Sequence, residues 1–144
     1  MPTAVVLGPI VGPDAVLPFY SCRVAAGFPS PAQDHMEKRI NFNELLNAHA
    51  PQVYTARAMG DSMQGIGLFD GDLMVVDRSL EVRPGAIVIA AINGEVFVKR
   101  FCREQGNIVL RPENPAYKPR FIMEGDELEI WGVVTHNLRD QQHG

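Results

Sequence analysis

The chain is poor in cysteine, in basic residues and in long apolar runs, and each shortage argues against a class of protein. Its 144 residues include two cysteines, Cys22 and Cys102, which have no metal-ligand spacing and are expected to be free thiols. Lysine and arginine number 13 against 17 aspartates and glutamates, and the resulting net charge of -4 argues against direct DNA binding. We expect neither a metal nor another cofactor.

The sequence also lacks a segment suited to a membrane. The longest apolar run, AIVIAAI, is far shorter than the ~20 residues that a helical span needs. The first residues, MPTAVVLGPIVGP, have no basic leader and are interrupted by glycine and proline before a signal-peptide core can form. We therefore expect a cytoplasmic protein without a membrane partner.

The length suits one domain with a sizeable core and an additional arm. Residues 1–33 are rich in proline and glycine, which predicts an extended arm with short strand pieces on the surface of the domain. Residues 34–144 are expected to form the domain. Helix starts are predicted at Asp34 in DHME and at Asn41 in NFNE, because each capping residue is followed three places later by glutamate.

From Tyr54 onward the sequence favours strands, and we expect a compact, mostly antiparallel β domain with short helices. Strand-like runs occur in GDLMVVD, NIVLRP and LEIWGVVTHNL. RPGAIVIAAINGEVFVKRF contains two more runs joined by Asn93-Gly94. Asn-Gly between apolar runs is a strong hairpin signal, because both residues tolerate positive φ.

Ser62, in the stretch ARAMGDSMQG, is a candidate nucleophile without an evident histidine base, since the histidines follow no pattern that singles one out. The predicted hairpin offers another base. A two-residue turn at 93 and 94 pairs Val88 with Lys99, and alternation of side chains puts Lys99 on an apolar face with Val88, Ala90, Phe97 and Phe101.

A lysine on such a face loses hydration of its ammonium group, which lowers its pKa toward roughly 7 or 8 and makes a neutral amine available. Lys99 could then deprotonate Ser62 and form a serine-lysine dyad. Two structural interpretations remain open: Lys99 extends its amine to solvent, and GDS is a turn in which Asp61 or Ser62 caps a helical turn.

The motifs AAGFPSP, GDSM, DGDLMVVD and GEVFVKRF, together with GAIVIAAINGE, resemble the LexA/UmuD-like family of self-cleaving serine peptidases. The similarity extends from about Phe19 to His136. It implies that Ser62 is the nucleophile, that Lys99 is the general base, and that the bond between Ala26 and Gly27 is cut. Backbone amides of Asp61 and Ser62 would stabilise the oxyanion.

The resemblance also implies a biological setting, the SOS response to DNA damage. There a RecA filament on single-stranded DNA stimulates self-cleavage, and the shortened homodimer serves a UmuC-like Y-family polymerase in translesion synthesis. LexA-like repressors have a DNA-binding helix-turn-helix, which we do not expect from a proline-rich arm. A non-catalytic β interaction module and a peptidase acting on other proteins are the alternatives.

Overall fold

A computed structural model describes residues 3–20 and 36–142, which are mostly β with one short α-helix. This confirms the predicted fold class. The elements, in chain order, are β1 (Ala4–Gly8), β2 (Val16–Tyr20), β3 (Met36–Asn41), α1 (Phe42–Leu45), β4 (Val53–Ala58), η2 (Gln64–Ile66), β5 (Leu73–Asp77), β6 (Ile87–Ile92), β7 (Glu95–Glu104), β8 (Asn107–Arg111), β9 (Arg120–Phe121) and β10 (Leu128–Leu138).

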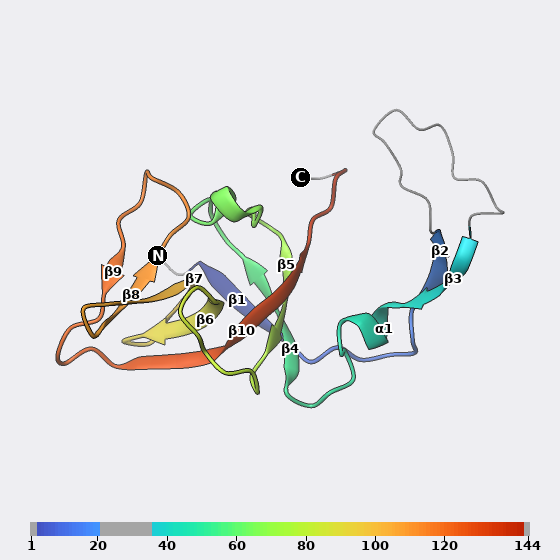
Figure 1. Cartoon of the computed structure of the whole chain (residues 1–144), viewed down its shortest axis with the longest axis horizontal. Helices are drawn as coiled ribbons and strands as arrows, with labels where there is room; N and C mark the ends of the chain where they lie inside the picture. The colour runs from blue at the N-terminus through green and yellow to red at the C-terminus, as the bar shows by residue number, and fades with distance from the viewer. Residues whose placement is uncertain (1–2, 21–35, 143–144) are drawn as a thin grey trace.

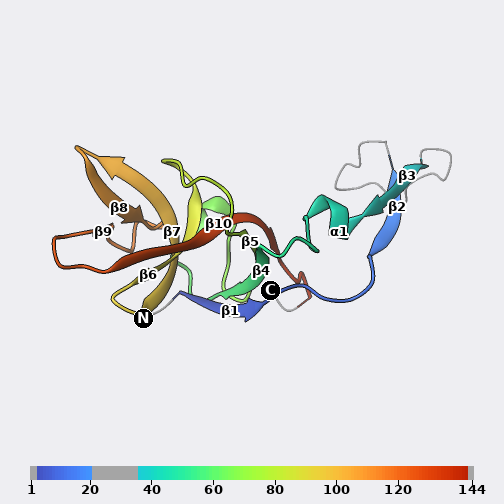
Figure 2. The ribbon, with the colours of Figure 1, turned by 90° about the horizontal axis from the view of Figure 1, so that it is seen from below.

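Two sheets are present in the described part of the chain. The larger has eight antiparallel strands in the order β1-β4-β5-β10-β6-β7-β8-β9, and it curls so that the start of β1 also contacts β7. The smaller sheet is the antiparallel pair β2–β3, which lies beyond α1 and away from the large sheet in both ribbon views (Figure 1 and Figure 2). The strand β10 runs through the middle of the large sheet between β5 and β6.

The hairpin predicted around Asn93-Gly94 is confirmed with its register. Both turn residues have positive φ, 49° at Asn93 and 87° at Gly94, as a two-residue turn of this type requires. Ile92 pairs with Glu95 and Val88 with Lys99 across β6 and β7. The hairpin therefore fixes which face of β7 carries the Lys99 side chain.

The core consists of two buried clusters on the two faces of the curled sheet. β6 contributes to both, because its side chains alternate between the faces and nearly all of them are buried. One cluster contains Val88, Ala90, Ile92, Phe101 and Leu110, and the other contains Ala4, Ala56, Ala58, Met63, Leu68, Met74, Val76, Ile89 and Val98. The second cluster holds Met63, which directly follows the candidate nucleophile.

The helix prediction from DHME is wrong, since residues 36–41 form β3. β3 has a partner strand in β2, and pairing between strands outweighs a local capping signal. The second helix start is confirmed: the Asn41 side chain accepts hydrogen bonds from the backbone N–H groups of Asn43 and Glu44.

The predicted arm contributes more to the fold than a surface segment would. β1 lies within residues 1–33 but is a strand of the large sheet, paired with β4 from Ala4 opposite Ala58 to Gly8 opposite Thr55. The division of the chain at residue 33 into arm and domain remains a prediction.

Candidate active site

Ser62 lies in the turn that leaves β4 and is almost completely buried, with 3% of its surface exposed. A hydrogen bond of 2.7 Å from Gly60 N to Asp70 Oδ1 holds the start of this turn. The next residue, Met63, is 2% exposed and packs in the core. An anchored Met63 and a fixed Gly60 leave the Ser62 hydroxyl little freedom of position.

Lys99, in the middle of β7, reaches this hydroxyl. Its Nζ lies 2.7 Å from Ser62 Oγ, although the residues are 37 positions apart in the sequence. The two side chains predicted to interact are therefore within hydrogen-bond distance, and the amine does not extend away into solvent.

Burial lowers the pKa of Lys99 to about 8 from its ordinary value of 10.5. The Phe97 ring, whose centre is 5.9 Å from Nζ, favours the charged amine by a cation–π contact, but the loss of hydration is the larger effect. At this pKa, about a tenth of Lys99 is neutral at pH 7 and can accept a proton.

The two histidines in the described residues have other partners. His49 Nε2 lies 2.7 Å from Asp14 Oδ1, and His136 Nδ1 lies 2.9 Å from the hydroxyl of Thr135. Neither makes a hydrogen bond with Ser62. Lys99 is accordingly the basic side chain that contacts this hydroxyl in the described part of the chain.

The loop after β8, with the sequence PENPAYKP, fixes the backbone around Ser62. Asn114 Nδ2 donates to Asp61 O at 2.9 Å, and Glu113 N donates to Ser62 O at 2.8 Å. Because a trans peptide directs its N–H opposite to its C=O, these bonds turn the N–H groups of Ser62 and Met63 away from the loop. Of the predicted oxyanion donors, Ser62 N–H thus has its direction set by Asn114.

Further contacts join this loop to the turn that contains Ser62. Gly65 N donates to Glu113 O at 2.8 Å, the Tyr117 hydroxyl donates to the Asp61 carboxylate, and Glu113 forms an ion pair with Arg100 on β7. No pattern in the sequence singles out this loop as part of the site. Its turn-forming PENP pattern is a signal for a loop, but it does not specify which segment the loop contacts.

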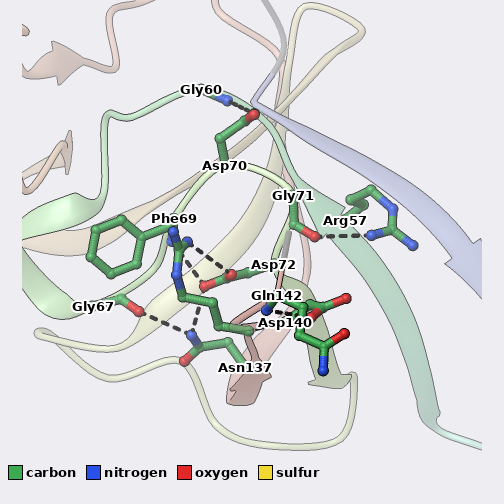
Figure 3. Close-up of polar contacts among 11 residues, drawn as sticks. Arg57, Gly60, Gly67, Phe69, Asp70, Gly71, Asp72, Asn137, Asp140 and Gln142 are labelled. Carbon is green, nitrogen blue, oxygen red and sulfur yellow. Dashed lines mark hydrogen bonds and ion pairs between the residues drawn. The ribbon is translucent and has the colours of Figure 1, made fainter. Parts of the chain in front are cut away.

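Residues 67–69, which follow Ser62 and η2, are held by the buried carboxylate of Asp72 (Figure 3). Asp72 Oδ2 accepts hydrogen bonds from Phe69 N at 2.9 Å and from Asn137 Nδ2 at 3.0 Å. Arg139 forms an ion pair with Asp72 and lies over the Phe69 ring, 4.2 Å from its centre. Asn137 also donates to Gly67 O, so the end of β10 holds the segment that follows Ser62.

A groove of about 550 Å³ leads along β7 to Lys99, and its walls include Ile92, Glu95, Phe97, Tyr117, Lys118 and Arg120. A larger hollow, of about 680 Å³ beside Trp131 and Tyr54, contains neither Ser62 nor Lys99. Lys99 is part of the lining of the first groove, whereas Ser62 is not among the residues that line it.

The predicted cleavage site, Ala26 and Gly27, lies outside the described residues. β2 ends at Tyr20 and β3 begins at Met36, and these two residues are paired. The strands therefore bracket the segment that contains the cleavage site.

The described residues contain no group of three or more histidine, cysteine, aspartate or glutamate side chains arranged to hold a metal ion. Among the same residues, no helix has the length and apolar character needed to cross a bilayer.

Comparison with known proteins identifies the family. The profile of the Peptidase S24-like family matches residues 18–135. The protein MucA of Salmonella typhimurium is 42% identical over 123 residues, which are 85% of this chain and 84% of MucA. SamA of Salmonella typhimurium is 43% identical over 118 residues, 82% of this chain and 81% of SamA.

The LexA repressor of Bordetella pertussis is 38% identical over 140 residues, 97% of this chain and 63% of the repressor. The match to the family profile spans most of the chain and includes both Ser62 and Lys99. The chain belongs to the Peptidase S24-like family, and so to the serine peptidases of the self-cleaving, LexA/UmuD-like kind.

Proposed function

We propose that this protein cuts its own chain between Ala26 and Gly27 with Ser62 as nucleophile and Lys99 as general base. The observation that carries the proposal is the 2.7 Å separation between Ser62 Oγ and Lys99 Nζ, together with the burial that lowers the pKa of the amine to about 8.

The reaction has two stages, formation of an ester on Ser62 and hydrolysis of that ester. Ser62 Oγ attacks the carbonyl carbon of Ala26 while its proton passes to neutral Lys99, and the oxyanion that forms accepts hydrogen bonds from the backbone N–H groups of Asp61 and Ser62. The intermediate collapses when the Lys99 ammonium gives its proton to the nitrogen of Gly27, which leaves Ala26 as an ester on Ser62. Water then gives a proton to Lys99 as it attacks the ester carbonyl, and the Lys99 ammonium returns this proton to Ser62 Oγ as the bond to Ala26 breaks, which restores the serine and leaves the Ala26 carboxyl group free.

An arm held beside the hydroxyl makes the attack effectively unimolecular, so a modest dyad suffices for a single cut. The observed rate is the intrinsic rate multiplied by the docked fraction of the arm. A partner that favours docking therefore acts as a switch, and a RecA filament on single-stranded DNA is the partner that the family resemblance suggests.

We further propose that the cut protein is a cytoplasmic homodimer that serves a UmuC-like Y-family polymerase in translesion synthesis during the SOS response. The similarity to MucA and SamA supports this role, because it covers more than four fifths of this chain and of each relative. The similarity to LexA supports the same DNA-damage setting.

The test is to incubate the purified protein at alkaline pH and determine the masses of the products. Fragments of residues 1–26 and 27–144 support self-cleavage. Ser62→Ala and Lys99→Arg are the matched variants: both are expected to keep the fold and to give no fragments, since arginine cannot release its proton. An uncut parent protein would favour a non-catalytic interaction module, and cutting of an added unrelated protein would favour a peptidase with external substrates.

A further inference from the structure

Two strands on the N-terminal side of the proposed cut are built into the fold. β1 forms one edge of the large sheet, where it is paired with β4, and both ribbon views place these strands side by side (Figure 1 and Figure 2). β2 pairs with β3 over residues 16–20 and 36–41. A cut between Ala26 and Gly27 would sever the chain but break none of these pairings.

The start of β1 fills a slot between β4 and β7. Thr3 N donates to Val96 O at 2.9 Å, and the Thr3 hydroxyl accepts from Val98 N at 2.7 Å, so Thr3 joins β7. On the other side, Thr3 O accepts from Met59 N at 2.8 Å, just beyond the end of β4. Residue 3 thus bridges the strand that carries Lys99 and the segment that leads to Ser62.

The slot selects by side-chain size. Ala4 is 3% exposed and packs against Ala56 and Ala58 in the core, whereas the neighbouring Val5 is 45% exposed and Leu7 is 50% exposed. The close fit is at one position: an occupant must be extended and must have a small residue at the place of Ala4, whereas Val6, the next residue on the same face of the strand, is 41% exposed. These requirements describe a binding site for a peptide strand.

A second attachment lies at the base of the β2–β3 pair. Asp14 accepts a hydrogen bond from Asn41 Nδ2 at 2.8 Å and contacts His49 Nε2 at 2.7 Å. Ala15 N donates to the Asn43 side chain at 2.6 Å. The N-terminal segment is therefore bound to the rest of the molecule at two separate places, and it can leave only when both are open at once.

We infer that cleavage does not by itself release the N-terminal segment: the segment stays bound to the cut protein, and the β1 slot is a peptide-binding site that exchanges its occupant after the cut. The ligand class is an extended peptide whose inward residue is small, as in the Thr-Ala-Val-Val of residues 3–6. This inference rests on the proposed site of self-cleavage. The protein would then be activated in two events: the chain is cut, and the peptide in the β1 slot is afterwards exchanged for another.

The test uses the full chain with Ser62→Ala and with residues 28–33 replaced by the recognition sequence of an added protease. The cut is then made whether or not the protein cleaves itself, so failure of the proposed function is detected separately, in the unmodified chain at alkaline pH. Native mass spectrometry after cutting is expected to find both pieces in one complex. Separate pieces at the first time point would overturn the inference.

Ala4→Glu and Val5→Glu are matched variants, one directed into the slot and the other outward. We expect Ala4→Glu to speed release of the segment at least about tenfold and Val5→Glu to leave it within about twofold of the parent. Equal release from the two variants would contradict a built slot. Thr3→Val, which removes the acceptor of Val98 N with little change of shape, gives the same comparison if Ala4→Glu does not fold.

A fluorescent synthetic peptide of residues 1–12 provides the binding assay. It is expected to enter the cut protein as the natural segment leaves, and excess unlabelled peptide should displace it while the Ala4→Glu peptide should not. Competition by both peptides alike would show that the slot does not select its occupant and would overturn the assignment.

Discussion

In the proposed mechanism, the pH dependence of self-cleavage is set by one amine, that of Lys99. Lys99 must be neutral to accept the Ser62 proton, and its pKa of about 8 sets how much of it is neutral. The neutral fraction is about one tenth at pH 7, one half at pH 8 and nine tenths at pH 9. We therefore expect the cleavage rate to rise nearly tenfold from pH 7 to pH 9 and to be level by about pH 10.

The assay is the first-order loss of full-length protein, measured without any activating partner in buffers of constant ionic strength from pH 6 to pH 10. Tyr117, at the rim of the site, has its pKa raised above 10.0 by its hydrogen bond to Asp61, so it does not account for a midpoint near 8. A rate independent of pH over this range, or a midpoint near 10.5, would refute the role of Lys99 as a base with a lowered pKa. Lys99→Arg is the control and is expected to be inactive throughout.

Further predictions concern stability and the loops around the dyad. The folded-state pKa of Lys99 lies below the unfolded value, so its burial lowers stability increasingly as pH falls from about 10.5 to about 8. The difference in free energy of unfolding between Lys99→Met and the parent, measured in urea, should therefore shift by about 1–2 kcal/mol in favour of the variant as pH falls from 10.5 to 7, after allowance for partial solvation of the amine. Asn114→Ala removes the bond to Asp61 O and should slow cleavage about tenfold at the plateau without moving the midpoint of the pH profile; a shifted midpoint would contradict a purely positional role. Asp72→Asn removes the buried carboxylate charge that pairs with Arg139 and that accepts hydrogen bonds from Phe69 N and Asn137, and it should lower the free energy of unfolding by about 2–3 kcal/mol; an unchanged urea midpoint would show that these contacts contribute little. Gly65→Ala would put a Cβ atom 2.5 Å from Glu113 O and should cost about 1–3 kcal/mol in the same measurement; an unchanged urea midpoint would show that this loop shifts at no cost.

Local patterns in the sequence predict the centre of the site well. Asn93-Gly94 specifies a tight turn, and because side chains alternate along a strand, the turn also specifies the face on which Lys99 lies. The lowered pKa follows from the apolar residues on that face. No local pattern relates Lys99 to Ser62, 37 residues away. Their interaction is predicted because a serine nucleophile needs a base and because the family resemblance pairs the two residues.

Features that depend on distant partners could not be predicted in this way. The capping pattern at Asp34 is as good locally as the one at Asn41, but β2 is available to pair with residues 36–41 and turns them into a strand. β1 is a second example. Proline and glycine near residues 4–8 predict an arm, but these residues form a sheet strand because β4 offers a free edge. The contact of Asn114 with Asp61 depends on the path of a loop, which composition does not determine.

The position of β10 in the large sheet bears on when the protein can react. β10 lies between β5 and β6, so it separates the strands next to Ser62 from the hairpin that carries Lys99, yet its residues follow both in the chain. A ribosome that has translated only as far as Glu127 has made Ser62 and Lys99 without β10, which in the described part of the chain is one of two connections between the halves of the sheet, the other being the contact of Thr3 with β7. In the proposed mechanism, we therefore expect nascent chains to cut themselves only slowly until β10 has joined the sheet.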